Sequence, residues 1–156
     1  MPPLTKSFGA FSLPQAYDIQ KVLTSSLVQE LGPVIGYKVA YASRAAQQQF
    51  GIAAPASAPL FLLQQVPPGT EIRKEIFRDL LIETEVAFTI AKRIEKPLAT
   101  VADLKPLVGF VHCAFELAEN RFDPAEGAAG VVDQVASGAG SQPFITGPAL
   151  PGHRSD

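Results

Sequence analysis

This chain of 156 residues has one cysteine, a net charge close to zero and no long apolar run. Each of these features excludes a class of protein. The one cysteine, Cys113, cannot form a disulfide within the chain, which fits a reducing cytoplasm. A net charge of −2 gives no basic surface for nucleic acid. No apolar run approaches the length of a membrane span, and residues 1–6 lack the core of a signal peptide. We therefore expect a cytoplasmic protein that binds neither nucleic acid nor a membrane.

The composition is that of a folded globular protein. Hydrophobic residues make up 47% of the chain and charged residues 18%, which argues against disorder. A chain of this length can bury a hydrophobic core and corresponds to one domain. We therefore expect a single domain over residues 1–156.

Residues 14–31 have the pattern of an amphipathic helix. Ser12 is a candidate N-cap, and Gly32 with Pro33 ends the pattern. Apolar side chains recur at intervals of three and four residues, which predicts one buried stripe. The stripe consists of Ala16, Ile19, Val22, Leu23, Leu27 and Leu31.

The rest of the chain alternates between β-rich runs, short helices and turns. Ser43 and Thr100 are candidate N-caps of two short helices. Glycine and proline become frequent beyond Phe122, so we expect a loosely structured end. The patterns predict strands at 34–41, 60–65, 80–91 and 108–117, helices at 43–50 and 100–107, and a loop of small residues at 53–59.

Two carboxylates interrupt the apolar run at residues 80–91. Glu83 and Glu85 are two positions apart, so in a strand they point to the same face, about 7 Å apart along the backbone. One interpretation is a solvated face at a sheet edge, since most Glu side chains are exposed. The other is a divalent-cation site. The apolar flanks suit a strand covered on both faces, and a hard cation offsets the repulsion between buried carboxylates.

A third carboxylate, Glu116, interrupts the second long apolar run. Alternation places it on one strand face together with His112. If the two strands are neighbours, Glu116 completes a set of three with Glu83 and Glu85, and three carboxylates plus water suit Mg²⁺ or Mn²⁺. A lone histidine in an apolar run is more often a core residue than a member of such a site.

Lys38 is the one charged residue in the β-rich run at 34–41. One interpretation is a lysine that extends its ammonium to water along an apolar surface. The other is a desolvated lysine that relays protons beside a metal-bound substrate.

Three segments, in order along the chain, are similar to motifs of one known family. Residues 36–51, GYKVAYASRAAQQQFG, resemble its signature GWKIGLTSKAVQQQLG. Residues 82–88, IETEVAF, resemble its IEAEIAF box, and residues 115–122, FELAENRF, resemble its LEIVDSRI box. The family is that of the 2-keto-4-pentenoate hydratases and 4-oxalocrotonate decarboxylases, within the fumarylacetoacetate hydrolase superfamily. The resemblance covers residues 13–147.

The resemblance implies an α+β fold, with an N-terminal helix and a partial mixed β-roll of the fumarylacetoacetate hydrolase C-terminal-domain type. Residues 1–32 would form the helical segment and residues 33–147 the metal-binding β-rich part of one incomplete hydratase-like domain. Residues 131–137, VVDQVAS, resemble the family's VADNAS segment, which implies that Ser137 binds substrate. The same resemblance implies the roles of four further residues: Glu83, Glu85 and Glu116 as ligands of Mg²⁺ or Mn²⁺, and Lys38 as the catalytic lysine.

The implied function is metal-dependent hydration of small 2-oxo or 2-hydroxy-dienoic acids, of the 2-hydroxypenta-2,4-dienoate type, in the catabolism of aromatic compounds. Decarboxylation of a 2-oxo acid is an alternative within the same family. A non-catalytic remnant that associates with an intact paralogue is a second alternative. A hydrolase of acylpyruvates is a third, and its acid–base pair would have to be His112 and Glu119. Family members are much longer, which predicts truncation and open sheet edges that associate, as a homo-oligomer or with a paralogue.

Overall fold

The computed structural model describes residues 1–140 and 143–150 of the chain. Its helices are α1 (Leu4–Phe8), α2 (Leu13–Leu31), α3 (Arg44–Phe50), α4 (Val101–Leu104) and α5 (Val131–Ala136). Its strands are β1 (Val34–Ala40), β2 (Ala56–Phe61), β3 (Leu80–Ile90), β4 (Val108–Glu119) and β5 (Phe144–Ala149). Short 3-10 turns occupy Leu62–Gln64, Lys74–Ile76, Lys105–Leu107 and Pro124–Glu126. No helix in this part of the chain is long and apolar enough to cross a membrane.

Side-chain caps set the ends of the helices where the sequence predicts them. The Ser12 amide donates to Gln15 Oε1 at 2.8 Å, and Ser12 Oγ accepts from the Gln15 amide at 3.5 Å, which forms a capping box at the start of α2. Gly32 ends this helix with φ 77°, a backbone angle that a Cβ atom disfavours. Ser43 caps α3 by accepting a hydrogen bond of 3.1 Å from the Ala46 amide.

The strands form two antiparallel sheets. β1 pairs with β2, and β4 is the middle strand between β3 and β5. Glu83 of β3 lies directly opposite Glu116 of β4. The α+β class predicted from the sequence is confirmed. Among the described residues, the parallel pairing expected of a mixed roll is limited to one bridge between Gln65 and Phe144.

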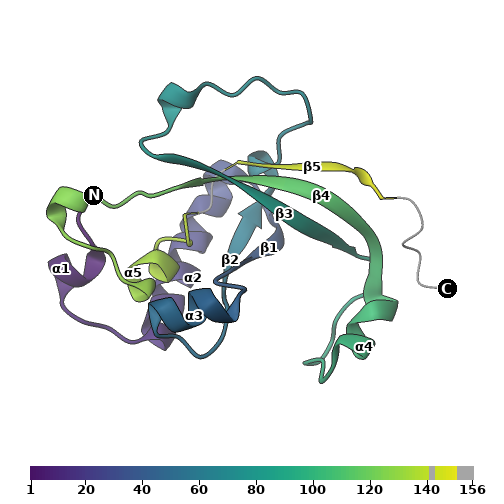
Figure 1. Ribbon diagram of the computed structural model, residues 1–156, viewed down its shortest axis with the longest axis horizontal. Coiled ribbons are helices and arrows are strands. Elements are labelled where there is room, and N and C mark those ends of the chain that lie inside the picture. The colour runs from purple at the N-terminus through teal and green to yellow at the C-terminus, as the bar shows by residue number, and fades with distance from the viewer. Residues whose placement is uncertain (141–142, 151–156) are drawn as a thin grey trace.

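The helices lie mainly on one side of the three-stranded sheet (Figure 1). α2 and α5 pack against each other on that side, near β1 and β2, whereas α4 lies apart near one end of β3 and β4. We call the face of this sheet that bears Glu83, Glu85 and Glu116 the inner face. The opposite, outer face carries alternating apolar residues of β3 and β4, among them Ile82, Val86, Phe88, Val111, Cys113 and Phe115.

The core lies where α2, α5 and β2 meet. Its buried cluster consists of Ala16, Ala56, Val135 and Ala136. Gln20 Nε2 donates to the carbonyl of Ser57 at 3.1 Å and to that of Val135 at 2.9 Å, so one buried amide ties α2 to β2 and α5. The apolar stripe predicted for α2 is only partly buried. Ala16 is 0% exposed, but Ile19 and Val22 are 39% and 69% exposed.

The loop predicted at residues 53–59 is wrong, because it contains most of β2. Ala56 and Ala58 of this strand are 2% and 0% exposed. Alanine and proline have low intrinsic β propensity, so the sequence pattern missed the strand. Ala56 belongs to one buried cluster with Ala16 of α2, so two small side chains let this helix pack close to the strand. The strand predicted at 60–65 is correct only at its first two residues, because Leu62–Gln64 form a 3-10 turn.

The described residues beyond Phe122 are more regular than predicted, and the predicted loose end at residues 151–156 lies outside the described part of the chain. In the first turn of α5, the buried Asp133 carboxylate accepts hydrogen bonds from the amides of Gly130 at 2.9 Å and Thr5 at 2.8 Å. β5 pairs with β4 and buries Phe144, which is 8% exposed. α5 and β5 are only six residues long each, so tertiary contacts rather than a local pattern support them.

The expectation that β3 is covered on both faces is also wrong. Ile82 and Phe88 on the outer face are 60% and 56% exposed. α1, α2, α3 and α5 lie on the other side of the sheet (Figure 1). Within the described residues, the apolar side chains of the outer face are therefore largely exposed.

Replacing Ala16 with Leu tests the packing of the core. Ala16 is 0% exposed between α2, α5 and β2, so the larger side chain overpacks the contact and we expect a loss of about 1–3 kcal/mol in the free energy of unfolding. Urea unfolding followed by circular dichroism measures the change. Val22→Leu on the exposed side of the same helix is the matched control, and a comparable loss in the control would contradict the assigned core.

Candidate metal centre

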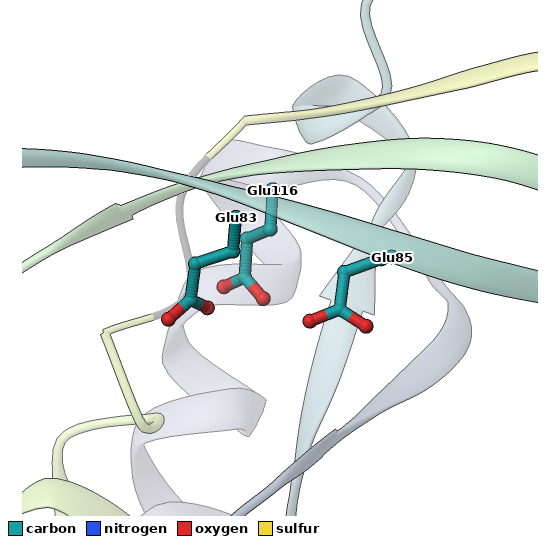
Figure 2. A group of neighbouring side chains, drawn as sticks. All are labelled: Glu83, Glu85 and Glu116. Atoms are coloured by element: carbon teal, nitrogen blue, oxygen red, sulfur yellow. The ribbon is translucent and has the colours of Figure 1, made fainter.

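Strand pairing brings the three predicted carboxylates together on the inner face. Glu83 and Glu85 alternate along β3, and Glu116 of β4 lies directly opposite Glu83. Figure 2 shows all three side chains leaving the sheet on the same side. One carboxylate oxygen from each residue lies within 4.8 Å of the other two. The neighbouring strands assumed from the sequence are therefore present.

The three carboxylates differ in their contact with water. Glu85 is exposed, Glu83 is partly buried, and Glu116 is 6% exposed. Burial raises the pKa of Glu116 above its ordinary value, the Lys38 ammonium partly opposes this, and Glu83 and Glu85 add to the rise. The interpretation as a solvated sheet face agrees with the exposure of Glu85 but not with the burial of Glu116. The cluster therefore lies at a boundary, open to solvent on one side and closed beneath.

Lys38 of β1 reaches the buried end of this cluster. Its Nζ forms an ion pair with Glu116 Oε1 and donates a hydrogen bond of 3.0 Å to the carbonyl of Ala139. The Lys38 side chain is only 10% exposed, so the interpretation that its ammonium extends to water is wrong. The ammonium supplies positive charge where Glu116 has lost hydration.

Sequence reasoning missed the Ala139 carbonyl as a contact of Lys38. Gly138, Ala139 and Gly140 all have positive φ, at 84°, 50° and 68°, and this left-handed turn follows α5. A Cβ atom on Gly140 would lie 2.9 Å from the Glu119 carbonyl oxygen, so the turn approaches β4 too closely for a side chain. Two glycines that flank one alanine were the available signal for such a turn.

Ser137, the predicted substrate contact, lies two residues before Ala139. It is 4% exposed, and its hydroxyl donates to the Gln134 carbonyl at 3.0 Å. Its own carbonyl accepts a hydrogen bond of 3.0 Å from the guanidinium of Arg121. Ser137 thus belongs to the end of α5 that leads into the turn beside Lys38, and its contact with substrate stays a prediction.

His112 has a structural place in the sheet. Its ring nitrogens lie 2.9 Å from Thr89 Oγ1 and 2.9 Å from the Gly147 carbonyl, so the imidazole links β3, β4 and β5. Glu119 Oε1 accepts a hydrogen bond of 2.7 Å from the Arg78 amide. His112 and Glu119 are seven positions apart on opposite faces of β4, so they do not form the acid–base pair that the acylpyruvate hydrolase alternative requires.

The donor set fits a divalent cation. Three carboxylates offer the hard oxygen ligands that Mg²⁺, Mn²⁺ and Ca²⁺ accept. Ligand oxygens of one such ion lie at about 2.0–2.6 Å from it, so oxygens within 4.8 Å of one another are close to the required spacing. The desolvated Glu116 adds a reason to bind positive charge, because its ionised form is disfavoured without it.

Curated proteins of similar sequence are hydratases. The TodF product hydratase of Pseudomonas putida is 27% identical over 145 residues, and the 2-keto-4-pentenoate hydratase of Paraburkholderia xenovorans is 26% identical over 145 residues. Each match covers 93% of this chain and 53% of the relative, so the chain spans about half the length of the curated relatives that it matches. No family model matches the chain. The resemblance read from the motifs is confirmed.

Solved structures with a similar fold come from the same group of proteins. The 4-oxalocrotonate decarboxylase from Pseudomonas putida G7 complexed with magnesium and adipate superposes with a TM-score of 0.86 at 22% identity, over 94% of this chain and 55% of that one. The same decarboxylase complexed with calcium and acetate gives a TM-score of 0.83 at 24% identity, over 94% of this chain and 54% of that one. At these identities the likeness establishes the fold.

Replacing Lys38 with Met tests the ion pair. The variant leaves Glu116 buried beside two other carboxylates without an ammonium, and breaking a buried pair costs about 3–5 kcal/mol of unfolding free energy. Urea unfolding in metal-free buffer measures the loss. The exposed Lys21→Met is the matched control, and Lys38→Met combined with Glu116→Gln recovers part of the loss. A single variant as stable as the control would contradict the buried pair.

Proposed function

We propose that this chain carries the metal-binding part of a divalent-metal-dependent lyase acting on small 2-oxo or 2-hydroxy-dienoic acids, with hydration of 2-hydroxypenta-2,4-dienoate as the reaction. The observation that carries the proposal is the contact of the buried Lys38 ammonium with Glu116 inside a cluster of three carboxylates. The names of the relatives support the same class of reaction. An aromatic-degradation pathway is the expected setting.

Glu83, Glu85 and Glu116 are the residues that would hold Mg²⁺ or Mn²⁺. Such an ion supplies Lewis-acid polarisation of the 2-oxo group and electrostatic stabilisation of the negative charge that develops on that oxygen. The exposed Glu85 marks the side from which a small acid reaches the site, because Glu116 and Lys38 close the opposite side.

Lys38 is the proton-transfer residue of the proposed reaction. Its Nζ is held from two sides, by Glu116 and by the Ala139 carbonyl, which fixes the direction of the remaining N–H bond. A fixed ammonium next to the substrate can deliver its proton to a carbon of the dienol and take one back when water adds to the alkene. Glu116 therefore has two roles, as a candidate metal ligand and as the group that orients Lys38.

Decarboxylation of a 2-oxo acid is the alternative reaction at the same residues. It needs the same stabilisation of charge on the 2-oxo oxygen, so the cluster and Lys38 serve either reaction. A non-catalytic role beside an intact paralogue is the other alternative. It is supported by the match to only about half the length of the relatives.

Turnover of 2-hydroxypenta-2,4-dienoate tests the proposed chemistry. We expect loss of the substrate's ultraviolet absorbance in the presence of Mg²⁺, with turnover reduced at least about a hundredfold in Glu83→Gln, because one carboxylate is removed from the cluster. Glu30→Gln, at an exposed position of α2, is the control and keeps full activity. Conversion of 4-oxalocrotonate without conversion of the dienoate would identify the decarboxylase instead.

Metal binding is measured separately from turnover. We expect the wild-type chain to bind Mn²⁺ in a titration followed by electron paramagnetic resonance, and Glu83→Gln to weaken the affinity at least about tenfold. Glu30→Gln again serves as the control. Mn²⁺ binding without turnover would support the non-catalytic alternative, and unchanged affinity in Glu83→Gln would contradict the assigned cluster.

A further inference from the structure

β3 has an open edge in the described part of the chain. It is the terminal strand of the order β3-β4-β5, so only one of its sides is paired. The strand is 11 residues long, and an unpaired edge of that length presents a row of free backbone N–H and C=O groups. Its outer-face residues Ile82, Val86, Phe88 and Ile90 are 46–60% exposed. Both features are those of a surface for strand addition.

The two ends of β3 carry opposite charge. Asp79 immediately precedes the strand, the neighbouring Arg78 is already held in an ion pair with Asp123, and Lys92 and Arg93 follow the strand. An antiparallel neighbour with the same sequence would bring the acidic end of one strand beside the basic end of the other. A parallel neighbour would instead place like charges together. The strand is therefore complementary to an antiparallel copy of itself.

We propose that two copies of this chain pair antiparallel through β3, about a twofold axis at Val86, into one sheet with three strands from each copy. This arrangement sets Asp79 opposite Arg93 of the second copy and Val86 opposite its own counterpart. Such an interface is isologous, so it closes at a dimer and leaves no open β3 edge.

The carboxylates of the inner face exclude two neighbouring registers and permit this one. Directly opposite residues of an antiparallel pair share a face. Pairing about Val86 sets Glu85 opposite Ala87 of the second copy, and Glu83 opposite its Thr89. Pairing about Thr84 or Glu85 would oppose carboxylate to carboxylate, which is destabilising. On the outer face the pairing about Val86 sets apolar Ile82 opposite Ile90, and Thr84 opposite Phe88.

The proposed dimer does not depend on the proposed chemistry, because it rests on the unpaired edge of β3 and on the charges at the ends of this strand. It also leaves the inner face and Lys38 in place within each copy. A dimer without turnover and turnover in a monomer are separate results, so the two proposals can fail independently.

Cysteine cross-linking tests the axis. The variant is Val86→Cys in a Cys113→Ser background, because Cys113 lies directly opposite Val86 on β4 and would compete for the new thiol. Opposite residues of an antiparallel pair have Cα atoms about 4.5–5.5 Å apart, within the range of a disulfide. We expect a covalent dimer on mild oxidation. Thr84→Cys in the same background is the control, since its counterpart would lie four residues away, at about 13 Å.

A charge exchange tests the register without touching the axis. Asp79→Arg opposes two basic residues at each end of the interface, and we expect the dimer dissociation constant to rise at least about tenfold in sedimentation velocity. Adding Arg93→Asp to the same chain restores opposite charges and the wild-type association. Asp18→Arg on α2 makes the same change in net charge away from β3 and leaves the association unchanged.

Circular dichroism confirms that each variant is folded before its association is compared. A folded wild-type chain that sediments as a monomer at micromolar concentration overturns the proposal and leaves the edge to a different protein. Cross-linking at position 84 as fast as at position 86, or no recovery in the charge-exchanged double variant, overturns it as well.

Discussion

The ion pair between Lys38 and Glu116 is the contact on which the site depends. Lys38 comes from the two-stranded sheet, Glu116 from the middle strand of the three-stranded sheet, and the Ala139 carbonyl that accepts the second hydrogen bond from the turn after α5. Three parts of the chain thus converge on one ammonium. A buried pair of this kind adds little net stability, because both partners lose hydration, but its loss leaves one charge buried without compensation. The pair therefore constrains the relative positions of these parts more than it strengthens the fold.

Side chains alternate between the two faces along β3 and β4, so the sheet has a carboxylate-bearing face and an apolar face. The inner face holds Glu83, Glu85 and Glu116, and the outer face holds the exposed apolar residues such as Val86. A shift of β3 by one residue against β4 would move Glu83 and Glu85 to the outer face and bring apolar side chains of β3 to the inner face. The register that sets Glu83 opposite Glu116 brings two carboxylates together, which repel each other. The same register keeps the carboxylates on the face that Lys38 of β1 contacts.

Local patterns in the sequence were sufficient for the capped helices and for the three carboxylates. Ser12 and Ser43 mark helix starts through contacts within four residues, and period-two alternation places Glu83 and Glu85 on one face whatever lies around them. β2 and α5 escaped prediction because their support is not local: Ala56 is buried in one cluster with Ala16 of α2, and Asp133 is held by Thr5 from the other end of the chain. The burial of β3 was overestimated for a related reason. An apolar run indicates that a strand face is suited to burial. Whether another element covers that face depends on contacts that the local pattern does not contain.

The balance of charge at the site connects the role of Lys38 to the metal. Three ionised carboxylates and one ammonium would leave two negative charges, which one divalent cation would neutralise. In the proposed reaction, Lys38 donates a proton to the substrate and regains one before product leaves. Without the cation, the same excess of negative charge falls on Glu116, whose pKa is raised by burial and by its two acidic neighbours. The ammonium thus compensates the buried charge of Glu116 in the absence of metal, and a bound cation would complete that neutralisation.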